Sequence, residues 1–471
     1  HTHRAGIRQH GKGFRQAAFQ EYSRLSIMLR NLLAWVPVCG AGIANAAQMG
    51  AADLPDYEPV QVVIADAPPT TPFIIGERWS MGGNFGARIR YDRSAQDSGN
   101  TAEAVTLLPQ GQFALLYDDP GYFRFFTSIK AAKDVLVHTS HSQSARDMEM
   151  DLDEFYARWQ STPALSVTLG RARMTDSRNW IYGNSENKND SLQILYRDRR
   201  RTLQFSIIGK DVFPRDLMAA DVLRESVNLV GVYAQSYMDA LRDSAIALVQ
   251  DDETPGKKAD RRYAGLRARG TLLGHFRYWA DTIFLRGRAS GQNLRANAFD
   301  TGLVYTAPVW SEPRVVLSYA HGSGDPEPGD GADGRFHPTG LGDNKHQYGG
   351  VSRFKYYGEA LDPALSNLHV FTVATGARFS ERQSLDLVYH QYILDTSSDA
   401  LYASGFNQYT TGPSRDVGDS LDVIYGYKDR NAFEIELLAS FFRPGSAFAV
   451  DLDDNVRLGF REKYNFSPRK H

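Results

Sequence analysis

Charged side chains occur at every second position in several short runs of the chain, and they are the residues whose types could do chemistry. In the run 456–466, Arg457 and Arg461 fall on one face of an extended strand, and apolar residues fill the other face. In the run 433–441, Glu436 takes the polar face in the same way. Because a charge is too costly to bury unpaired in a packed core, these faces predict a water-filled interior. Charged groups along such an interior can bind and select charged solutes.

A similar run lies near the start of the patterned part of the chain. Arg88 and Arg90 face away from Phe85, Ile89 and Tyr91 when this run is extended. A period of two with one apolar face is typical of a strand that is covered on that face only. Comparable runs continue almost to the end of the chain and are separated by turn residues. The pattern therefore predicts an all-β fold.

Composition and charged faces together indicate which kind of β protein this is. Tyr (24), Phe (25) and Gly (41) are abundant, and aromatic residues gather near the ends of the runs, as in the girdles of membrane barrels. Mean hydropathy is −0.41, and no stretch has the roughly 18 uninterrupted apolar residues of a membrane-spanning helix. A large soluble β protein would share this composition. The charged faces favour a single transmembrane antiparallel β-barrel of the outer-membrane type.

Motifs of catalytic centres do not occur in the sequence, which contains no HExxH, no Walker A loop and no GxSxG. The GxGxxG match at Gly329–Gly334 lies in a polar loop with no strand directly before it, so we interpret it as chance. His138 and His141 lie in a polar stretch and are more typical of solvated side chains than of a metal site. We therefore expect no enzyme activity, no cofactor and no metal. A net charge of −2 with mixed signs argues against nucleic-acid binding.

Residues 28–46 look like a secretory signal peptide. Arg30 supplies a positive start, a short apolar core follows, and Ala44–Ala46 fit the small-x-small rule for cleavage after the last of them. Cys39, the single cysteine, lies in this segment, so we expect a mature chain without thiols. We also expect Met28 to be the true start.

Two longer linkers interrupt the rhythm of the runs. Residues 251–262 are charged and contain Pro255-Gly256, and residues 321–357 are polar and glycine-rich. Loops as long as the second are functional or disordered. The expected organisation is a leader stretch at 1–27 (a soluble basic arm is the alternative), the signal peptide at 28–46, a periplasmic segment at 47–81, the barrel at 82–466 and a tail at 467–471.

The string FHPTGLGDNKHQYGGVSRFKYYGEALDPALSNLH at Phe336–His369 resembles the alginate export protein family, whose members carry a TGL, basic residues, a GEA and an SNL in this order. The resemblance is strong over 300–466 and weaker over 84–210. It implies a barrel of about 18 strands, with about 16 as the alternative, in the bacterial outer membrane. It also implies an electropositive constriction that passes an anionic polysaccharide, contacts with membrane lipid and lipopolysaccharide, and periplasmic components of an export complex as partners.

The family lines its pore with basic residues and a few acids. By position, the resemblance assigns lining roles to Arg90, Glu154, Arg173, Lys345 and Arg353. We expect Arg90, Arg173 and Arg353 to converge on one constriction, because distant strands meet around a lumen. The polar faces described above add four further candidates for the pore lining, namely Arg88, Arg457, Arg461 and Glu436. Glu436 stands at a position where the family has an arginine.

Two functions remain open at this point. The first is passive export of an anionic exopolysaccharide, alginate or similar to alginate, through an electropositive pore. The alternative is a porin for small solutes, either substrate-specific or general. The loop at 321–357 discriminates between them, because we expect an export channel to use it as a lid and a porin to fold it into the lumen.

Overall fold

The protein is described by a computed structural model in which residues 60–471 form one compact unit. No helix in the described part of the chain is both long and apolar enough to cross a membrane. The residues that the structure describes are 63–64, 71–95, 101–140, 148–175, 188–197, 201–209, 228–236, 243–254, 257–339, 344–397, 399–402, 406, 410, 414–429, 433–448 and 452–466.

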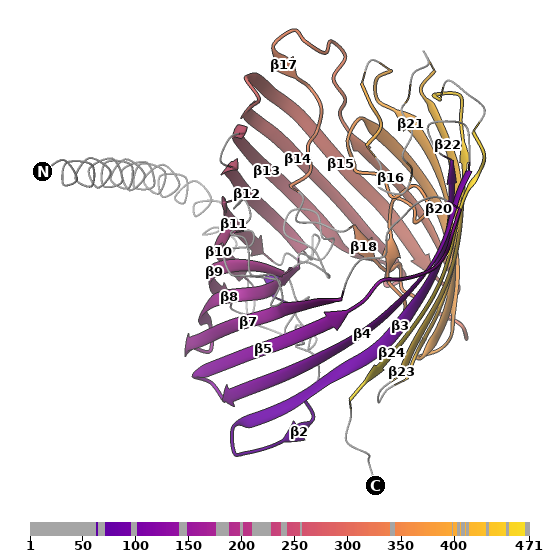
Figure 1. Ribbon diagram of the computed structural model, residues 1–471. Helices are drawn as coiled ribbons and strands as arrows, with labels where there is room; N and C mark the ends of the chain where they lie inside the picture. The colour runs from indigo at the N-terminus through magenta and orange to yellow at the C-terminus, as the bar shows by residue number, and fades with distance from the viewer. Residues whose placement is uncertain are drawn as a thin grey trace, which may run out of the picture. The chain divides into compact units, whose positions relative to one another are not determined.

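Eighteen strands of the described residues follow one another around a closed ring of antiparallel pairs (Figure 1), in which β24 returns to pair with β3. The ring confirms the predicted barrel, and its strand number agrees with the first of the two expected values. The strands are β3 (Trp79–Ala95), β4 (Thr101–Asp119), β5 (Phe123–Ala132), β7 (Glu149–Thr162), β8 (Leu165–Thr175), β9 (Lys188–Arg197), β10 (Arg201–Gly209), β11 (Asn228–Ser236), β12 (Asp243–Thr254), β13 (Lys257–Leu272), β14 (Phe276–Ala289), β15 (Gln292–Thr306), β16 (Arg314–Gly322), β20 (Leu368–Ser380), β21 (Gln383–Leu394), β22 (Asp416–Lys428), β23 (Phe433–Pro444) and β24 (Asn455–Asn465).

The described residues also form six shorter strands outside this ring. Three of them extend the wall by pairing with a ring strand: β1 (Val63–Ile64) with β8, β2 (Phe73–Ile74) with β3, and β6 (Val135–Thr139) with β4. The other three belong to the long connection between β16 and β20. They are β17 (Ala332–Asp333), which runs parallel to β15, and β18 (Lys345–His346) and β19 (Phe354–Lys355), which pair with each other.

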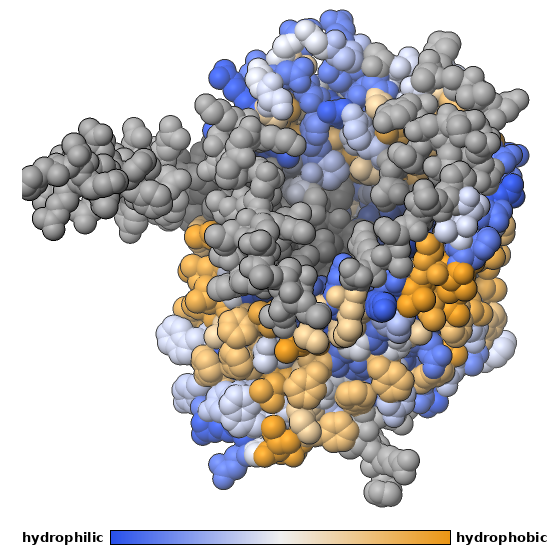
Figure 2. Space-filling view, in the orientation of Figure 1, coloured by the Kyte–Doolittle hydropathy of each residue, from blue (hydrophilic) through white to orange (hydrophobic). Residues whose placement is uncertain are grey.

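The outer surface of the ring is apolar, as the alternating runs predicted. On β23, Leu437 and Phe441 are exposed, whereas Ser440 and Phe442 on the other face are fully buried. The same parity exposes Leu317 of β16. Figure 2 shows hydrophobic residues gathered over the lower part of the visible face and hydrophilic residues toward the top. Because a lipid-facing surface must be apolar and a lumen-facing surface can be polar, this parity is that of a membrane barrel.

The two ends of the barrel differ in the length of their connections. Short hairpin turns such as Asp119–Phe123 and Leu272–Phe276 connect the strands at one end. In these turns Gly121 and Gly274 have positive φ values of 84° and 74°, which favour glycine. Longer connections, including the one from β16 to β20, leave from the other end. Outer-membrane barrels place short turns in the periplasm and long loops outside the cell, which fixes the orientation.

Candidate functional site: the barrel lumen

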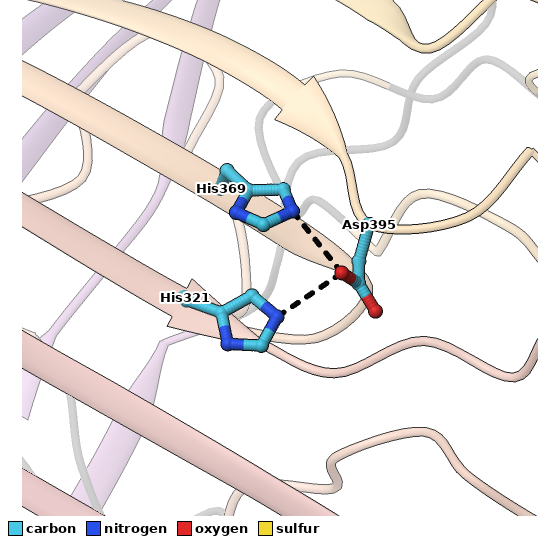
Figure 3. Close-up of side chains that lie close together, drawn as sticks. All are labelled: His321, His369 and Asp395. Carbon is cyan, nitrogen blue, oxygen red and sulfur yellow. Dashed lines mark hydrogen bonds and ion pairs between the residues drawn. The ribbon is translucent and has the colours of Figure 1, made fainter.

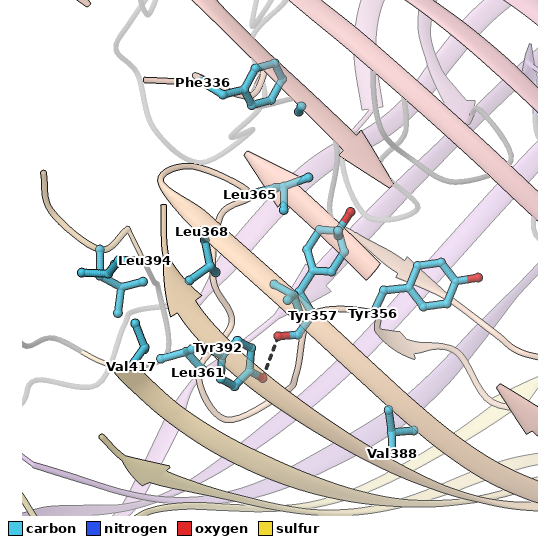
Figure 4. Packing of buried hydrophobic residues seen from close by; sticks show 14 of the residues in the cluster. Phe336, Tyr356, Tyr357, Leu361, Leu365, Leu368, Val388, Tyr392, Leu394 and Val417 are labelled. Carbon is cyan, nitrogen blue, oxygen red and sulfur yellow. Dashed lines mark hydrogen bonds between the residues drawn. The ribbon is translucent and has the colours of Figure 1, made fainter. Parts of the chain in front are cut away.

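The connection between β16 and β20, residues 323–367, is called the lumen segment below, because its described residues 336–339 and 344–367 pack against the inner face of the barrel (Figure 4). Tyr357 of this segment donates a hydrogen bond from its hydroxyl to Asp300 Oδ2 over 2.9 Å. Asp300 is buried on the inner face of β15, and it also accepts a hydrogen bond from Trp279 Nε1 over 2.6 Å. This part of the lumen segment is therefore attached to the inner wall, whereas β17, nearer its start, lies at the rim beside the loop end of β15.

Aromatic and aliphatic side chains of the lumen segment form a core with the inner wall. Tyr348 and Tyr356 stack with ring centroids 4.8 Å apart, and Trp279 of β14 lies parallel to Tyr356 at 6.5 Å. Full burial of a large apolar side chain contributes about 1.5–3 kcal/mol, so this packing holds the segment firmly. The buried hydrophobic residues of the segment are Phe336, Tyr348, Phe354, Tyr356, Tyr357, Ala360, Leu361 and Leu365.

The lumen segment also contacts the wall on strands further around the ring. The side-chain amide of Asn455 on β24 donates to the carbonyl oxygen of Ala360 over 3.1 Å. The backbone N–H of Glu359 donates to Asp422 Oδ2 on β22 over 3.1 Å. The hydroxyl of Tyr392 on β21 donates to the backbone carbonyl oxygen of Tyr357 over 2.9 Å. These anchors, with those on β14 and β15, attach the segment to roughly half of the ring.

Three cationic side chains gather on the hairpin that β18 and β19 form within the lumen segment. Lys345 lies opposite Lys355 in the β-ladder, and Arg353 Nη2 donates a hydrogen bond to the carbonyl oxygen of Lys345 over 2.9 Å. Lys355 also forms an ion pair with Asp362. We call Lys345, Arg353 and Lys355 the basic hairpin. It presents positive charge inside the barrel.

Buried ion pairs connect neighbouring strands of the wall. Arg171 of β8 donates from Nε to Asp190 of β9 over 2.8 Å, and both side chains are almost fully buried. Arg267 of β13 donates in the same way to Asp281 of β14 over 2.9 Å. Such pairs stay charged inside a protein only when geometry and hydrogen bonds compensate for the loss of water. These arginines therefore stabilise the wall through neighbouring acids.

A buried carboxyl group lies where the lumen segment meets the wall. Burial raises the pKa of Glu359 above its ordinary value, and the nearby carboxylate of Asp422 raises it further. The backbone N–H of Lys355 donates to Glu359 Oε1 over 2.9 Å, and the charges of Lys345 and Lys355 act in the opposite direction. Protonation of Glu359 therefore favours the docked arrangement of the segment.

Comparison with known proteins identifies the family. Residues 78–456, which include every strand of the ring up to the start of β24, match the alginate export family. The chain belongs to the alginate export family. The resemblance noted in the sequence is thereby confirmed, and the match extends well upstream of the segment that was most similar. No curated protein matches the chain.

Solved structures agree with this assignment at the level of the fold. OccK2 (OpdF) of Pseudomonas aeruginosa superposes with a TM-score of 0.54 at 12% identity, covering 87% of this chain and 100% of that chain. OpdK of the same organism, solved with vanillate, gives 0.52 at 13% identity, covering 82% and 98%. OccAB2 of Acinetobacter baumannii gives 0.51 at 10%, covering 82% and 98%. This alginate export family member is a channel of the bacterial outer membrane.

The predicted lining residues of β3 and β24 lie close together at the seam of the barrel. Arg88 lies opposite Arg461 in the ladder between these strands. Arg90 Nε and Arg457 Nε both approach Asp92, at 2.6 Å and 2.7 Å. Arg461 Nη2 lies 3.5 Å from the carboxylate of Glu436, the residue found at the family's arginine position.

The remaining predicted residues are distributed over two other parts of this family member. Lys345 and Arg353 are brought together in the basic hairpin. Glu154 is buried on β7, opposite Ser128 of β5, and Arg173 lies in β8 with its Cα opposite that of Lys188. Convergence of the three arginines on one constriction stays a prediction. The leader stretch, the signal peptide, the tail and His141 lie outside the described residues.

One group of potential ligands was missed at the level of sequence. His321 of β16 and His369 of β20 are opposite each other in the ladder, and Asp395 follows β21 (Figure 3). In sequence the two histidines are far apart and match no metal-ligand spacing. Their shared signal is that each occupies an outward-facing position at the loop end of its strand. The sequence alone does not show that β16 and β20 pair with His321 opposite His369, so the expectation of no metal was made without this pairing.

Proposed function

We propose that this channel exports an anionic exopolysaccharide, alginate or a similar polymer, by passive passage through the lumen. The observation that carries the proposal is the basic hairpin, which places Lys345, Arg353 and Lys355 inside a barrel of the alginate export family. Two of these three residues were predicted from the sequence as pore-lining positions. Their cationic groups suit the carboxylates of an acidic polymer.

Passive export requires contacts that are several and weak. Arginine keeps its charge at any working pH and offers a planar fork to a carboxylate, whereas lysine acts as a compact point charge. Asp362, which pairs with Lys355, and Glu359 lie beside the same hairpin. These acids compete with the polymer for the cations, so no single contact holds the chain for long. The channel would need no covalent chemistry.

A second candidate, diffusion of small solutes, is favoured by the position of the lumen segment. The sequence left open whether this segment covers the mouth of the barrel or folds inside. Its described part from Phe336 onward folds inside, and aromatic packing and the hydrogen bonds of Tyr357 and Asn455 hold it there. A lumen narrowed in this way admits small solutes readily, whereas an extended polymer would need room beside the segment.

Single-channel recording in planar bilayers tests the first candidate. We expect the wild-type channel to prefer anions, and the double substitution Lys345→Glu/Arg353→Glu to reverse or abolish that preference. The matched control is Arg443→Glu, a charge reversal at an exposed arginine that pairs with Asp419 outside the lumen. An unchanged reversal potential in the double variant would contradict an electropositive constriction at the basic hairpin.

Block by oligosaccharides separates the two candidates. Acidic oligouronates and neutral dextrans of equal length are added to the periplasmic side of the wild-type channel. Export predicts frequent, short current blocks with the acidic chains and few with the neutral ones, and loss of this difference in Lys345→Glu/Arg353→Glu. Equal behaviour of both oligosaccharides, with free passage of small solutes, would favour the diffusion channel.

A further inference from the structure

Three potential metal ligands meet on the outer surface of the barrel, at the end that carries the long loops (Figure 3). The Nε2 atoms of His321 and His369 lie 3.2 Å and 3.1 Å from the same oxygen of Asp395, Oδ1. The two imidazole rings stack with centroids 4.6 Å apart, so both nitrogens point the same way. The three side chains are between 19% and 29% exposed, which leaves the cluster open to small ions.

The spacing of these atoms fits tetrahedral coordination. Zinc binds imidazole nitrogen at about 2.0–2.1 Å and carboxylate oxygen at about 2.0–2.2 Å, which places neighbouring ligand atoms roughly 3.3 Å apart. The distances from both nitrogens to Asp395 Oδ1 are close to this value. All three ligand atoms lie within 4.8 Å of one another, so a metal between them would require the side chains to shift closer together.

The partners behind the ligands also suit a metal site. Tyr319 Oη lies 2.8 Å from His369 Nδ1, so it can accept a hydrogen bond from Nδ1–H, which leaves the lone pair of Nε2 free to coordinate. The second oxygen of Asp395 accepts a hydrogen bond from the backbone N–H of Gly324 over 2.8 Å. Ligating histidines and carboxylates are held in this way in metal proteins, where such second contacts fix ring orientation and tautomer.

We propose that His321, His369 and Asp395 form a binding site for a divalent transition metal ion, zinc in the first place. Two imidazole nitrogens and one carboxylate oxygen suit zinc, copper or nickel, whereas calcium and magnesium prefer oxygen ligands alone. Three protein ligands leave the fourth tetrahedral position for water. The site lies outside the lumen and is independent of the polymer proposed as cargo.

The location of the site gives the metal a structural consequence. The hydrogen bond from Gly324 connects Asp395 to the first turn of the lumen segment. His321 and His369 belong to the two strands that the segment joins. A bound metal would lock Asp395 against both strands and would thereby fix the start of the lumen segment.

Arg415 competes with a metal at this site. Its Nη2 lies 3.4 Å from His369 Nε2, while its Nε donates to the carbonyl oxygen of Leu394 over 2.6 Å. A metal would have to displace Nη2 and would be repelled by its charge. Arg415→Gln should therefore bind metal more tightly than the wild-type protein, by about tenfold.

Metal titration of the purified, folded full chain tests the proposal. We expect one zinc or cobalt ion per chain at this site, with tetrahedral d–d absorption of the cobalt form. His321→Gln, His369→Gln and Asp395→Asn should each weaken binding at least tenfold. The matched control is His275→Gln, which removes an exposed histidine from the turn between β13 and β14. It should leave this binding unchanged.

Two further measurements exclude a trivial loss of folding. Heat-modifiable electrophoretic mobility reports whether each variant forms the barrel, and Tyr319→Phe keeps all three ligands while weakening metal affinity severalfold. Metal binding that is equal in wild type, His321→Gln and His369→Gln would overturn the proposal, as would the absence of binding to the folded wild-type chain. In either case the cluster would be a hydrogen-bonded brace only.

Discussion

Arg314 of β16 and Asp386 of β21 form a buried ion pair although β20 runs between their two strands. Gly376 of β20 lies opposite both residues in the two ladders. Because Gly376 has no side chain, the guanidinium crosses β20, and its Nε donates to Asp386 Oδ1 over 3.2 Å. Gly350 of the lumen segment lies against the same pair, where a side chain would collide with Asp386. The pair therefore joins three strands and leaves space for the segment.

Gly376→Ala should destabilise the barrel through this ion pair. The added Cβ would lie 2.6 Å from Asp386 Oδ1 and 2.7 Å from Arg314 Nη2, so the pair must separate. Breaking a buried pair costs about 3–5 kcal/mol, which sets the upper limit for the loss in free energy of unfolding. Urea unfolding in lipid vesicles measures it. The control is Gly459→Ala, whose Cβ meets only the Leu438 side chain, at 3.5 Å; equal losses in both variants would contradict the assignment.

Leu437→Arg should destabilise the barrel because Leu437 faces lipid. Its side chain is exposed on the outer surface of β23, and an arginine near the middle of the membrane costs about 2–4 kcal/mol. Glu434→Gln on the other face of the same strand loses an ion pair with the largely exposed Lys428 and should cost less than about 1 kcal/mol. Unfolding in vesicles compares the two. Large losses in both would mean that the faces are assigned wrongly.

Tyr357→Phe should loosen the lumen segment without unfolding the barrel. The substitution removes the hydrogen bond to Asp300, worth about 0.5–1.5 kcal/mol, while Trp279 still donates to the same carboxylate. We expect higher single-channel conductance and faster proteolysis within the segment. Tyr389→Phe, at an exposed tyrosine on the outer face of β21, serves as the control. Unchanged conductance in Tyr357→Phe would show that this contact does not hold the segment.

Glu359 should make the docking of the lumen segment depend on pH. Burial and Asp422 raise the pKa of Glu359 in the docked state above its ordinary value of 4.5, so the docked state binds more protons. Docking is therefore strongest below that value and weakens as the pH rises through the raised pKa. Hydrogen exchange of the segment amides should show protection falling over this range. In Glu359→Gln the protection should be higher at neutral pH and the dependence should be lost; an unaltered pH profile would exclude Glu359 as its source.

The wall of the barrel could be predicted from sequence, because a membrane barrel imposes a strict period of two. Leu437 and Ser440 fall on the faces that their alternation indicated. The strand number came from the family resemblance. The charged residues 251–262 were wrongly predicted to be a linker: β12 and β13 continue through them and turn between Thr254 and Lys257. Charge did not mark a strand end there, because strands that extend beyond the membrane can carry polar residues on both faces.

The contents of the lumen could be predicted only in part. Lys345 and Arg353 were expected to line the pore from their positions in the family motif; the structure brings them together, and their lining role stays a prediction. The burial of Tyr356 and Leu361 was not predicted, because apolar residues of a non-repetitive segment show no period. The meeting of His321 with His369 depends on the register of two strands separated by the lumen segment, which single-sequence reasoning does not provide.

Arg457 has a consequence for how the chain folds. Its Nε binds Asp92, which is 365 residues away in sequence, and its Nη1 donates to the carbonyl oxygen of Glu359 in the lumen segment. The first and last ring strands pair although they are far apart along the chain, and chain entropy opposes this pairing until many other strands have paired. The Arg457 side chain thus couples closure of the ring to docking of the lumen segment against the inner wall. Folding rates measured for Arg457→Lys should reveal this step as a slow phase, late in assembly, that governs both events together.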